Sequence, residues 1–358
     1  MRVTRLWLTN FRNYTTAELE PDPDGLTVIV GSNGEGKTNL LEAIGYLATL
    51  SSFRGAPSEA LVRQGCASAV VRAEGERDDR ALLIEAELVA GGRDRIQVNR
   101  QPLKRARDLL GALRVSVFAP DDLVLVKGGP GERRRFLDDV LVALHPKFDA
   151  LQRDVDRVLR QRNTLLRQSG GKASPEIAST LDVWDAKLVT TGTALVEARE
   201  DLIAQLEPEI AKAYDQVAHT AADVSVAYQR SWSGPLADAV AASRPDDLRR
   251  GVTLVGPHRD EVTLAIGGLP GRTHASQGEQ RSLALALRLA AHRVVGEAVG
   301  ASPVLLLDDV FSELDPDRSE ALLTHLPPGQ ALLTTAGVVP ESARPGTLVR
   351  VAGGALVG

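Results

Sequence analysis

The chain has 358 residues, of which 43% are hydrophobic and 25% charged, with a formal net charge of −5. Its length exceeds one typical domain, so a large α/β unit with an insert or second lobe is expected. An acidic chain has no overall basic field, so any nucleic-acid contact must be local. The single cysteine, Cys66, excludes an intramolecular disulfide, and no apolar run approaches the roughly 20 residues of a membrane span. We therefore expect a cytoplasmic protein.

The first third of the chain carries short β-branched or alternating apolar runs, which predict strands at 2–10, 27–30, 69–73, 81–88 and 113–118. One helix, at about 37–50, interrupts them. From Asp121 onward the apolar residues recur at helical spacing, which predicts helices over 133–144, 148–167 and 176–213. A break at 169–175, rich in small residues, indicates a helical hairpin or small bundle.

After residue 251 the α/β pattern resumes, with predicted helices at 278–299 and 316–326 and predicted strands at 303–307 and 330–334. The simplest organisation is one discontinuous α/β domain, built from 1–120 and 251–358. A helical lobe, 121–250, is inserted between its two halves.

A phosphate-binding loop is the strongest motif in the chain. It matches G-x-x-x-x-G-K-[ST] between an apolar strand end and a helix, and runs Gly31, Ser32, Asn33, Gly34, Glu35, Gly36, Lys37, Thr38. The glycines let backbone N–H groups face phosphate oxygens, and the positive end of the following helix favours the same charge. Lys37 is expected to reach the β- and γ-phosphates of ATP, and Thr38 to place its hydroxyl on Mg²⁺.

Two aspartates follow the apolar strand 303–307, in the pattern of a Walker B motif. Asp308 is the expected Mg²⁺ partner. Asp309 is the candidate that orients or deprotonates the attacking water.

A third motif, Ser276-Gln-Gly-Glu-Gln-Arg281, opens the helix that follows it. Ser276 and Glu279 fit a capping box, whereas Gly278 costs roughly 0.8–1 kcal/mol relative to alanine, which indicates close access to the backbone there.

The order of these motifs, with Ser312-Glu-Leu-Asp315 after Walker B, resembles ABC-type ATPases: P-loop, signature, Walker B and D-loop. The stretch from Thr38 to Ser276 is too long for compact transporter subunits and too short for chromosome-maintenance ATPases with very long coiled coils. The chain resembles the RecF family of bacterial recombination mediators in segments spread along its length: 10–14, 52–54, 118–123, 126–130, 133–138, 159–163 and 256–260.

The resemblance implies an ABC-type ATPase head, a mixed sheet with flanking helices, carrying a helical insert. It implies that Ser276 and Gly278 act on ATP held by a second copy, in an ATP-dependent homodimer. Arg12 and Asn13 would line the nucleotide site, with Arg54 a weaker candidate. The family engages duplex DNA and gapped junctions, and acts with RecO and RecR to load RecA in DNA repair and replication restart. The implied activity is a weak, DNA-dependent ATPase that works as a switch.

Three departures from the ABC pattern bear on the rate. Asp309 stands where transporter-type sites usually have glutamate, so the carboxylate is one methylene shorter and slow hydrolysis is expected. Thr334 and Thr335 occur where a switch histidine is expected. No glutamine can be assigned to the Q-loop.

Two basic clusters are candidates for DNA contact. The first contains Arg93, Arg95, Arg100, Lys104, Arg105 and Arg107; the second contains Arg133, Arg134, Arg135, Arg160 and Arg162. We select Arg105, Arg133, Arg134 and Arg160 as DNA-binding candidates, although such runs are usually solvated faces. His258, between Gly-Pro and Arg-Asp, is read as part of a structured turn rather than as a catalytic histidine.

Three other classes stay open at this point. A transporter energiser would need a groove for a membrane partner, and a chromosome-organising ATPase would need a long coiled coil or hinge. A metabolic P-loop kinase would have no use for the signature and D-loop pair.

Overall fold

A computed structural model of the protein describes residues 2–77, 80–172, 174–218, 222–337 and 339–357. The chain divides into two compact units. Unit 1 comprises Met1–Leu123, Glu209–Ala221 and Ser276–Gly358, and unit 2 comprises Val124–Pro208 and Ala222–Ala275.

This division differs from the expected one at 121–123 and 209–221, which belong to unit 1, and at 251–275, which belongs to unit 2. The difference at 251–275 follows from strand pairing. β10 (Glu261–Ile266) pairs antiparallel with β9 (Val224–Gln229), so its backbone hydrogen bonds tie it to the unit that holds most of the helices.

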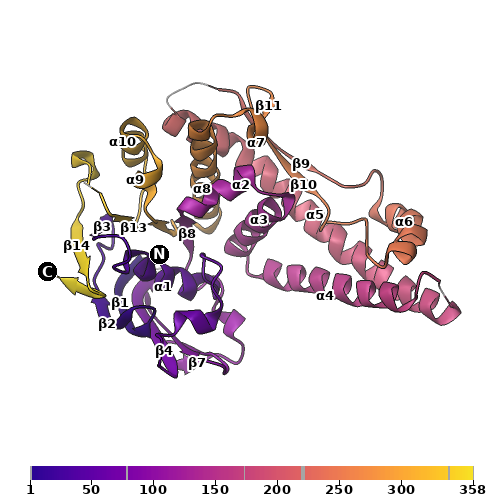
Figure 1. Ribbon diagram of the computed structural model, residues 1–358, viewed down its shortest axis with the longest axis horizontal. Helices are drawn as coiled ribbons and strands as arrows, with labels where there is room; N and C mark the ends of the chain where they lie inside the picture. Colours follow the sequence, from indigo (N-terminus) through magenta and orange to yellow (C-terminus); the bar gives the residue numbers. More distant parts are fainter. Residues whose placement is uncertain (1, 78–79, 173, 219–221, 338, 358) are drawn as a thin grey trace. The chain divides into compact units, whose positions relative to one another are not determined.

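A six-stranded sheet forms the centre of unit 1 (Figure 1). Its strands in spatial order are β15 (Ala355–Val357), β14 (Thr347–Ala352), β3 (Leu26–Val30), β13 (Ala331–Thr335), β12 (Val304–Leu307) and β8 (Val115–Phe118). Every neighbouring pair is parallel except β14 with β15. All residues of β12 and β13 are buried, as in a sheet covered on both faces. Because carboxyl ends of parallel strands share one edge, the segments after β3, β13, β12 and β8 meet there.

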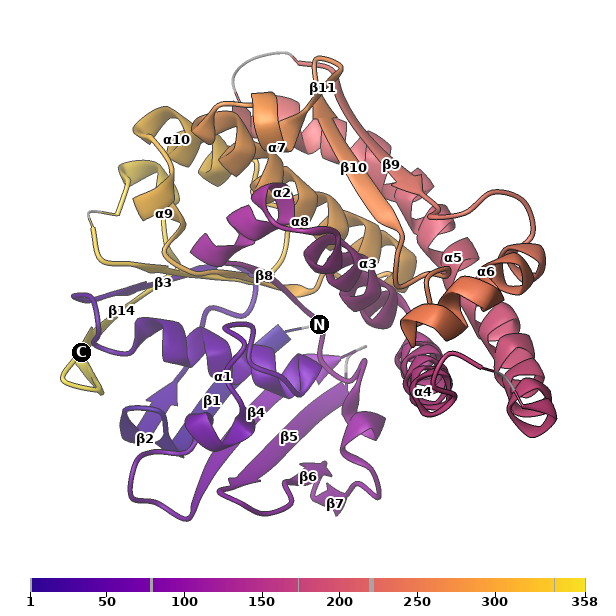
Figure 2. The same cartoon turned by 45° about the vertical axis from the view of Figure 1, so that its right-hand side comes forward.

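The second sheet of unit 1 is antiparallel. In spatial order it contains β2 (Tyr14–Leu19), β1 (Arg2–Phe11), β4 (Ser68–Arg77), β5 (Arg80–Val89), β6 (Arg95–Val98) and β7 (Gln101–Pro102). α1 (Lys37–Thr49) packs against strands of both sheets, and Leu40, Leu41, Ile44 and Leu47 on it are fully buried. Figure 2 shows α1 lying across β1 and β4. The motif helix is therefore anchored in the main hydrophobic core of the unit.

The remaining regular elements of unit 1 are helical. They are α8 (Gln277–Val299), α9 (Val310–Glu313), α10 (Pro316–Thr324), the C-terminal part of α5 and four short 3₁₀ helices, η1 (Ser58–Leu61), η2 (Ala106–Leu109), η3 (Pro120–Leu123) and η4 (Glu341–Ala343). α8 carries a hydrophobic surface nearly all round, so it is buried along most of its length.

Unit 2 is mainly helical, as the spacing of apolar residues predicts. Its helices are α2 (Val124–Lys127), α3 (Pro130–Leu144), α4 (Lys147–Gln168), most of α5 (Pro175–Ala218), α6 (Leu236–Arg250) and α7 (Gly271–His274). A small antiparallel sheet, β11 (Leu269–Pro270), β10 and β9, completes it. Of the helices in the described residues, none is long and apolar enough to cross a membrane.

Candidate functional site

The phosphate-binding loop leaves β3 at the carboxyl edge of the central sheet and enters α1. Two of its glycines are required by space and conformation. A Cβ on Gly31 would lie 2.4 Å from the carbonyl oxygen of Val351. Gly36 has a φ of 112°, and a Cβ on it would lie 2.5 Å from Nδ2 of Asn13. No other residue type adopts such a φ without strain, so the motif glycines are the residues that the local backbone needs.

Lys37 lies inside the loop that precedes it. Its side chain is 7% exposed, and its Nζ donates to the carbonyl oxygens of Gly31 at 2.8 Å and Ser32 at 2.9 Å. The loop thus curls around the ammonium group and holds it at the N-terminal end of α1. An anion at this point would meet both the lysine charge and the unpaired N–H groups of the helix.

Asp308, at the end of β12, joins two other elements of the same sheet edge. Its Oδ1 accepts a hydrogen bond from Thr38 Oγ1 at 2.7 Å and one from Thr334 Oγ1 at 2.7 Å. Burial raises the pKa of Asp308, and the hydrogen bonds from Thr334 and Thr38 act in the opposite direction. A positive ion beside this carboxylate would offset the cost of its burial.

The pair of Thr38 and Asp308 fits a magnesium ion. Both offer hard oxygen donors, which Mg²⁺ prefers, and the ion demands octahedral geometry at about 2.0–2.1 Å, so neighbouring ligand oxygens lie about 2.9 Å apart. The 2.7 Å separation of Thr38 Oγ1 and Asp308 Oδ1 is close to that spacing. These two side chains can therefore lie in one coordination sphere.

Asp309 has an unusual backbone conformation. Its φ of 47° is in the left-handed region, and its N–H donates to both the carbonyl oxygen and the Oγ1 of Thr334, at 3.1 and 2.9 Å. Such strain in a residue other than glycine persists only where neighbours hold it. Thr334 holds it here, which the sequence does not reveal. The Thr334 hydroxyl thus supports the acidic pair.

The predicted nucleotide contacts Arg12 and Asn13 lie beside the loop, in a pocket of about 760 Å³ that Asn39, Arg54 and Arg63 also line. Asn13 braces the loop, because its Nδ2 donates to Glu35 O at 2.8 Å. Arg12 has a partner that the sequence does not indicate. Its Nε and Nη2 donate to the two carboxylate oxygens of Glu42, at 2.7 and 2.6 Å.

Glu42 is fully buried in α1 and also accepts a hydrogen bond from Ser52 Oγ at 2.5 Å. A buried carboxylate is stable only when it is paired and hydrogen-bonded. Arg12 therefore stabilises the buried Glu42 carboxylate in addition to lining the pocket.

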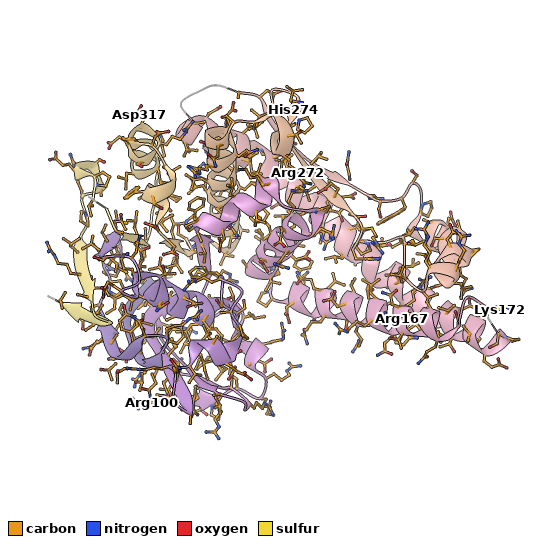
Figure 3. All side chains as sticks on the ribbon, viewed as in Figure 1. Arg100, Arg167, Lys172, Arg272, His274 and Asp317 are labelled. Carbon is orange, nitrogen blue, oxygen red and sulfur yellow. The ribbon has the colours of Figure 1, made fainter. Side chains whose placement is uncertain are left out.

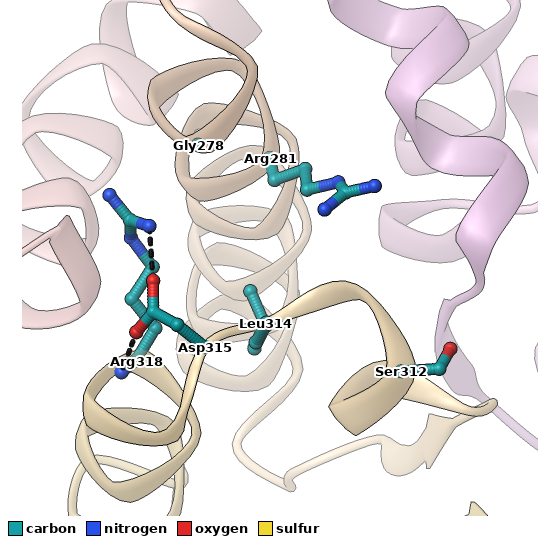
Figure 4. A pocket seen from close by; sticks show the side chains of 6 residues that line it. All are labelled: Gly278, Arg281, Ser312, Leu314, Asp315 and Arg318. Carbon is teal, nitrogen blue, oxygen red and sulfur yellow. Dashed lines mark hydrogen bonds and ion pairs between the residues drawn. The ribbon is translucent and has the colours of Figure 1, made fainter.

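The motif at 276–281 forms the capping box that its sequence predicts. Ser276 Oγ accepts from the backbone N–H of Glu279 at 3.3 Å, and Glu279 Oε2 accepts from the N–H of Ser276 at 2.7 Å. Hydrogen bonds from Ser276 lower the pKa of Glu279. Gly278 lies on the wall of a separate pocket of about 230 Å³, which Arg281, Ser312, Leu314, Asp315 and Arg318 also line (Figure 4).

The structure corrects part of the predicted DNA contact set. Arg133 is only 7% exposed, and its guanidinium donates to both oxygens of Glu261 and to the carbonyls of Leu125 and Gly128. Arg162 is completely buried between Asp185 and Asp247. These two guanidinium groups form ion pairs inside unit 2 and are too buried to contact DNA.

The other candidates in these clusters differ in exposure. Arg134 is half-buried, donates to the carbonyl of Asp260, and has its pKa lowered mainly by burial. Arg160 on α4 is exposed, as is Arg105, whose side chain is 82% exposed and pairs with Asp108. Arg105 and Arg160 are thus the accessible members of the set.

His258 lies in the turn at 256–259, as expected. Its Nε2 lies 3.0 Å from Thr253 O, and burial lowers its pKa to about 4, so the ring is neutral near pH 7.

On the other side of the Walker B strand, β8 is followed by Ala119, Pro120, Asp121 and Asp122, with no glutamine. Asp122 is tied to Ala119 N at 2.9 Å and to Arg288 of α8 at 2.5 Å, a link that the sequence does not indicate.

The central parallel sheet defines the class of the protein. The P-loop strand β3 and the acidic strand β12 flank β13 in the sheet. Along the chain, the P-loop is followed by the capped signature-type helix α8, then by the acidic strand and the D-loop. This is an ABC-type P-loop ATPase head with a large helical insertion.

Comparison with known proteins identifies the family. A family model described as RecF/RecN/SMC N terminal domain matches residues 2–331. The DNA replication and repair protein RecF of Streptomyces avermitilis is 47% identical over 354 residues, which are 94% of each chain, and that of Frankia alni is 47% identical over 359 residues, also 94% of each. The chain belongs to the RecF family of DNA replication and repair proteins.

Solved structures agree with this family at the level of the whole fold. The recombination mediator protein RecF with ATP, in the RecFOR pathway, aligns with a TM-score of 0.91 at 28% identity, over 99% of this chain and 97% of that one. An Smc head bound to the C-winged helix domain of ScpA aligns with a TM-score of 0.60 at 15% identity, over 99% of this chain and 96% of that one, which is a likeness of fold alone.

Proposed function

We propose that this protein is an ATP-dependent, DNA-binding recombination mediator, in which ATP binding drives dimerisation on duplex DNA or gapped junctions and slow hydrolysis resets the dimer. The observation that carries the proposal is the shared sheet edge, where Lys37 lies inside its loop and Thr38 donates to Asp308. This arrangement would hold a metal-bound triphosphate. In DNA repair and replication restart, the dimer would act with RecO and RecR to promote RecA loading. These partners are proposed from the RecFOR setting of the related ATP-bound structure.

At the proposed ATP site, the loop residues 31–36 bind phosphate oxygens through their N–H groups, and Lys37 leaves its carbonyl partners for the β- and γ-phosphates. Thr38 and Asp308 would hold Mg²⁺, which when bound neutralises charge on the phosphates. Asp309, held by Thr334, orients or deprotonates the attacking water. Arg12, Asn13 and Arg54 line the adjoining pocket, where the rest of the nucleotide would lie.

The proposed dimer follows from the separation of the two phosphate-facing motifs. Among the described residues that line the pocket at Gly278, none belongs to the P-loop at 31–38. We infer that the phosphate facing Gly278 is supplied by the ATP site of another chain. A two-fold pair in which each Ser276 and Gly278 faces the other copy's ATP satisfies both motifs at once.

Hydrolysis at this site is proposed to be slow. Asp309 is one methylene shorter than glutamate, and a misplacement near 1 Å can cost on the order of 10²-fold in rate. Weak turnover suits a switch, because ATP binding selects the closed dimer and hydrolysis returns the population to monomers.

For DNA contact we propose one face of α4 in unit 2. Arg153, Arg160 and Arg167 recur every seven residues, about 10.5 Å apart along the helix axis, and Arg157 falls on the same face. All four side chains are exposed, and we call this set the α4 arginine stripe. Figure 3 shows Arg167 on α4 and Lys172 just beyond its C-terminal end. A row of cations this long matches a phosphate backbone better than a single phosphate.

A measurement of DNA affinity with and without ATP tests this function. Fluorescence anisotropy on a gapped duplex should give much tighter binding with ATP than with ADP, because the dimer brings two arginine stripes to one DNA. Lys37→Met should bind DNA equally weakly in both nucleotides. Equal affinity of the natural protein with and without ATP would refute the switch.

A further inference from the structure

The guanidinium of Arg318 covers the face of the signature glycine. A Cβ placed on Gly278 would lie 2.8 Å from Nη1 and 3.0 Å from Nη2 of Arg318. Arg318 comes from the first turn of α10, directly after the D-loop, and Figure 4 shows its side chain turned toward the start of α8. The Arg318 guanidinium therefore fills the space beside Gly278, the one residue of the 276–281 motif that has no side chain.

Asp315 holds Arg318 there while it caps α10. Its Oδ1 accepts from the backbone N–H of Arg318 at 2.9 Å, and its Oδ2 pairs with Nη1 of the same residue. The Arg318 Nε is buried and has no hydrogen-bond partner among the described residues. Asp315 is 45% exposed and Arg318 25% exposed, so the pair is only partly shielded from water. Ion pairs of this kind contribute little stability, so the guanidinium can change partners at small cost.

The surroundings favour an anion as the alternative partner. Among the described residues that line the pocket of about 230 Å³, Arg281 and Arg318 are cationic and Asp315 is the acidic one. The carboxylate of Glu279 is already bound to the backbone of Ser276. A guanidinium presents a planar fork of donors that matches phosphate oxygens, and arginine forms two parallel bonds where lysine forms one.

We propose that Arg318 exchanges Asp315 for the terminal phosphate that a second copy of the chain presents to Gly278. Arg318 is then a phosphate-binding residue of the dimer, and Asp315 restrains it in the monomer by competing with the nucleotide. This inference rests on the proposed function, because the phosphate is supplied by the ATP site of the other copy.

The two residues of this pair should have opposite effects on dimerisation. In light-scattering titrations with ATP and Mg²⁺, Arg318→Gln should weaken the dimer about tenfold, as expected for the loss of one charged hydrogen-bond donor. Arg318→Lys should recover part of that loss. Asp315→Asn should strengthen the dimer several-fold, since asparagine keeps the helix cap but releases the arginine. Binding of a fluorescent ATP analogue to the dilute monomer should be the same in all three variants.

The outcomes separate this inference from the function on which it rests. If the natural protein dimerises with ATP and Arg318→Gln dimerises equally well, Arg318 does not bind the phosphate and the inference alone fails. If Arg318→Gln and Asp315→Asn both weaken the dimer, the pair is a structural clasp and the exchange is refuted. A natural protein that stays monomeric with ATP would overturn the proposed function and this inference together.

Discussion

Thr334 Oγ1 donates to Oδ1 of Asp308 at 2.7 Å, and the same hydroxyl accepts the backbone N–H of Asp309 at 2.9 Å. One fully buried threonine on the strand between the P-loop strand and the acidic strand thus fixes both carboxylates. Thr334 therefore fixes the positions of Asp308 and Asp309 although it carries no charge itself.

Thr334→Val keeps the shape of the side chain and removes this hydroxyl. We expect the ATPase rate to fall at least about tenfold, because Asp309 loses part of its support and small displacements are costly in rate. ATP binding should persist, and the free energy of unfolding should fall by about 1 kcal/mol. The matched control is Thr335→Val, since Thr335 Oγ1 accepts from Gly337 N at 3.1 Å and has no bond to either aspartate among the described residues. Equal rates for the two variants would show that Thr334 does not position the acidic pair.

Arg12→Met should destabilise the protein strongly, because it leaves the fully buried Glu42 carboxylate without its cation. Removing one partner of a buried ion pair typically costs about 3–5 kcal/mol. Urea unfolding of Arg12→Met, Glu42→Gln and the double variant should show a large favourable coupling, with the double variant more stable than Arg12→Met. Independent, additive effects would mean that Arg12 serves the nucleotide pocket alone.

The α4 arginine stripe predicts a salt-dependent DNA contact. Arg160→Gln with Arg167→Gln should weaken DNA binding in the presence of ATP and lower the slope of log affinity against log salt by about one unit for each arginine. Lys187→Gln, which removes one positive charge from α5 in the same unit, is the control for each single arginine substitution. If the control weakens binding as much as the stripe variants do, α4 contributes only net charge.

Buried His292 predicts a pH dependence of stability. It is 2% exposed, neither ring nitrogen has a hydrogen-bond partner among the described residues, and burial lowers its pKa to about 4. The unfolded chain, with a histidine pKa near 6.5, therefore takes up the proton first as the pH falls. Stability from this group is complete above pH about 6.5 and is lost on acidification toward pH about 4.

His292→Leu should raise the free energy of unfolding by about 1 kcal/mol at pH 7, since it removes unsatisfied buried polar atoms. It should also flatten the decline between pH about 6.5 and 4, measured by urea unfolding across that range. A variant with an unchanged pH profile would show that His292 does not contribute to the acid sensitivity.

The sequence predicts the parts of the site that depend on local chemistry. The loop at 31–38, the capping box of Ser276 and Glu279, and the helices of unit 2 each follow from residues close together in the chain. The small sheet in unit 2 was missed because β9 is short and lies after a long helical run, and its partner β10 is needed to make it a strand.

Arg133 is buried instead of exposed for a related physical reason. A run of three arginines indicates a charged surface, but Glu261 lies 128 positions away and folds against Arg133. The pairing of Arg12 with Glu42 and the support that Thr334 gives to Asp308 are likewise contacts between elements that only the folded chain brings together.

Gly278→Ala separates the signature role from a structural one. The atoms that a Cβ would meet are the tip of the flexible Arg318 side chain, so the helix can accommodate alanine, which also gains about 0.8–1 kcal/mol of helix propensity. The monomer should therefore stay folded and bind ATP. The methyl group would nevertheless stand where the other copy's phosphate approaches, so the variant should fail to dimerise.

Light scattering of the protein with ATP and Mg²⁺, with ADP, and without nucleotide, each with and without a gapped duplex, is the decisive measurement of the proposed ATP-dependent dimer. We expect a dimer with ATP for the natural protein, and a monomer in every condition for Lys37→Met and Gly278→Ala. A natural protein that is monomeric in all conditions, or a Gly278→Ala variant that dimerises with ATP as the natural protein does, would contradict it.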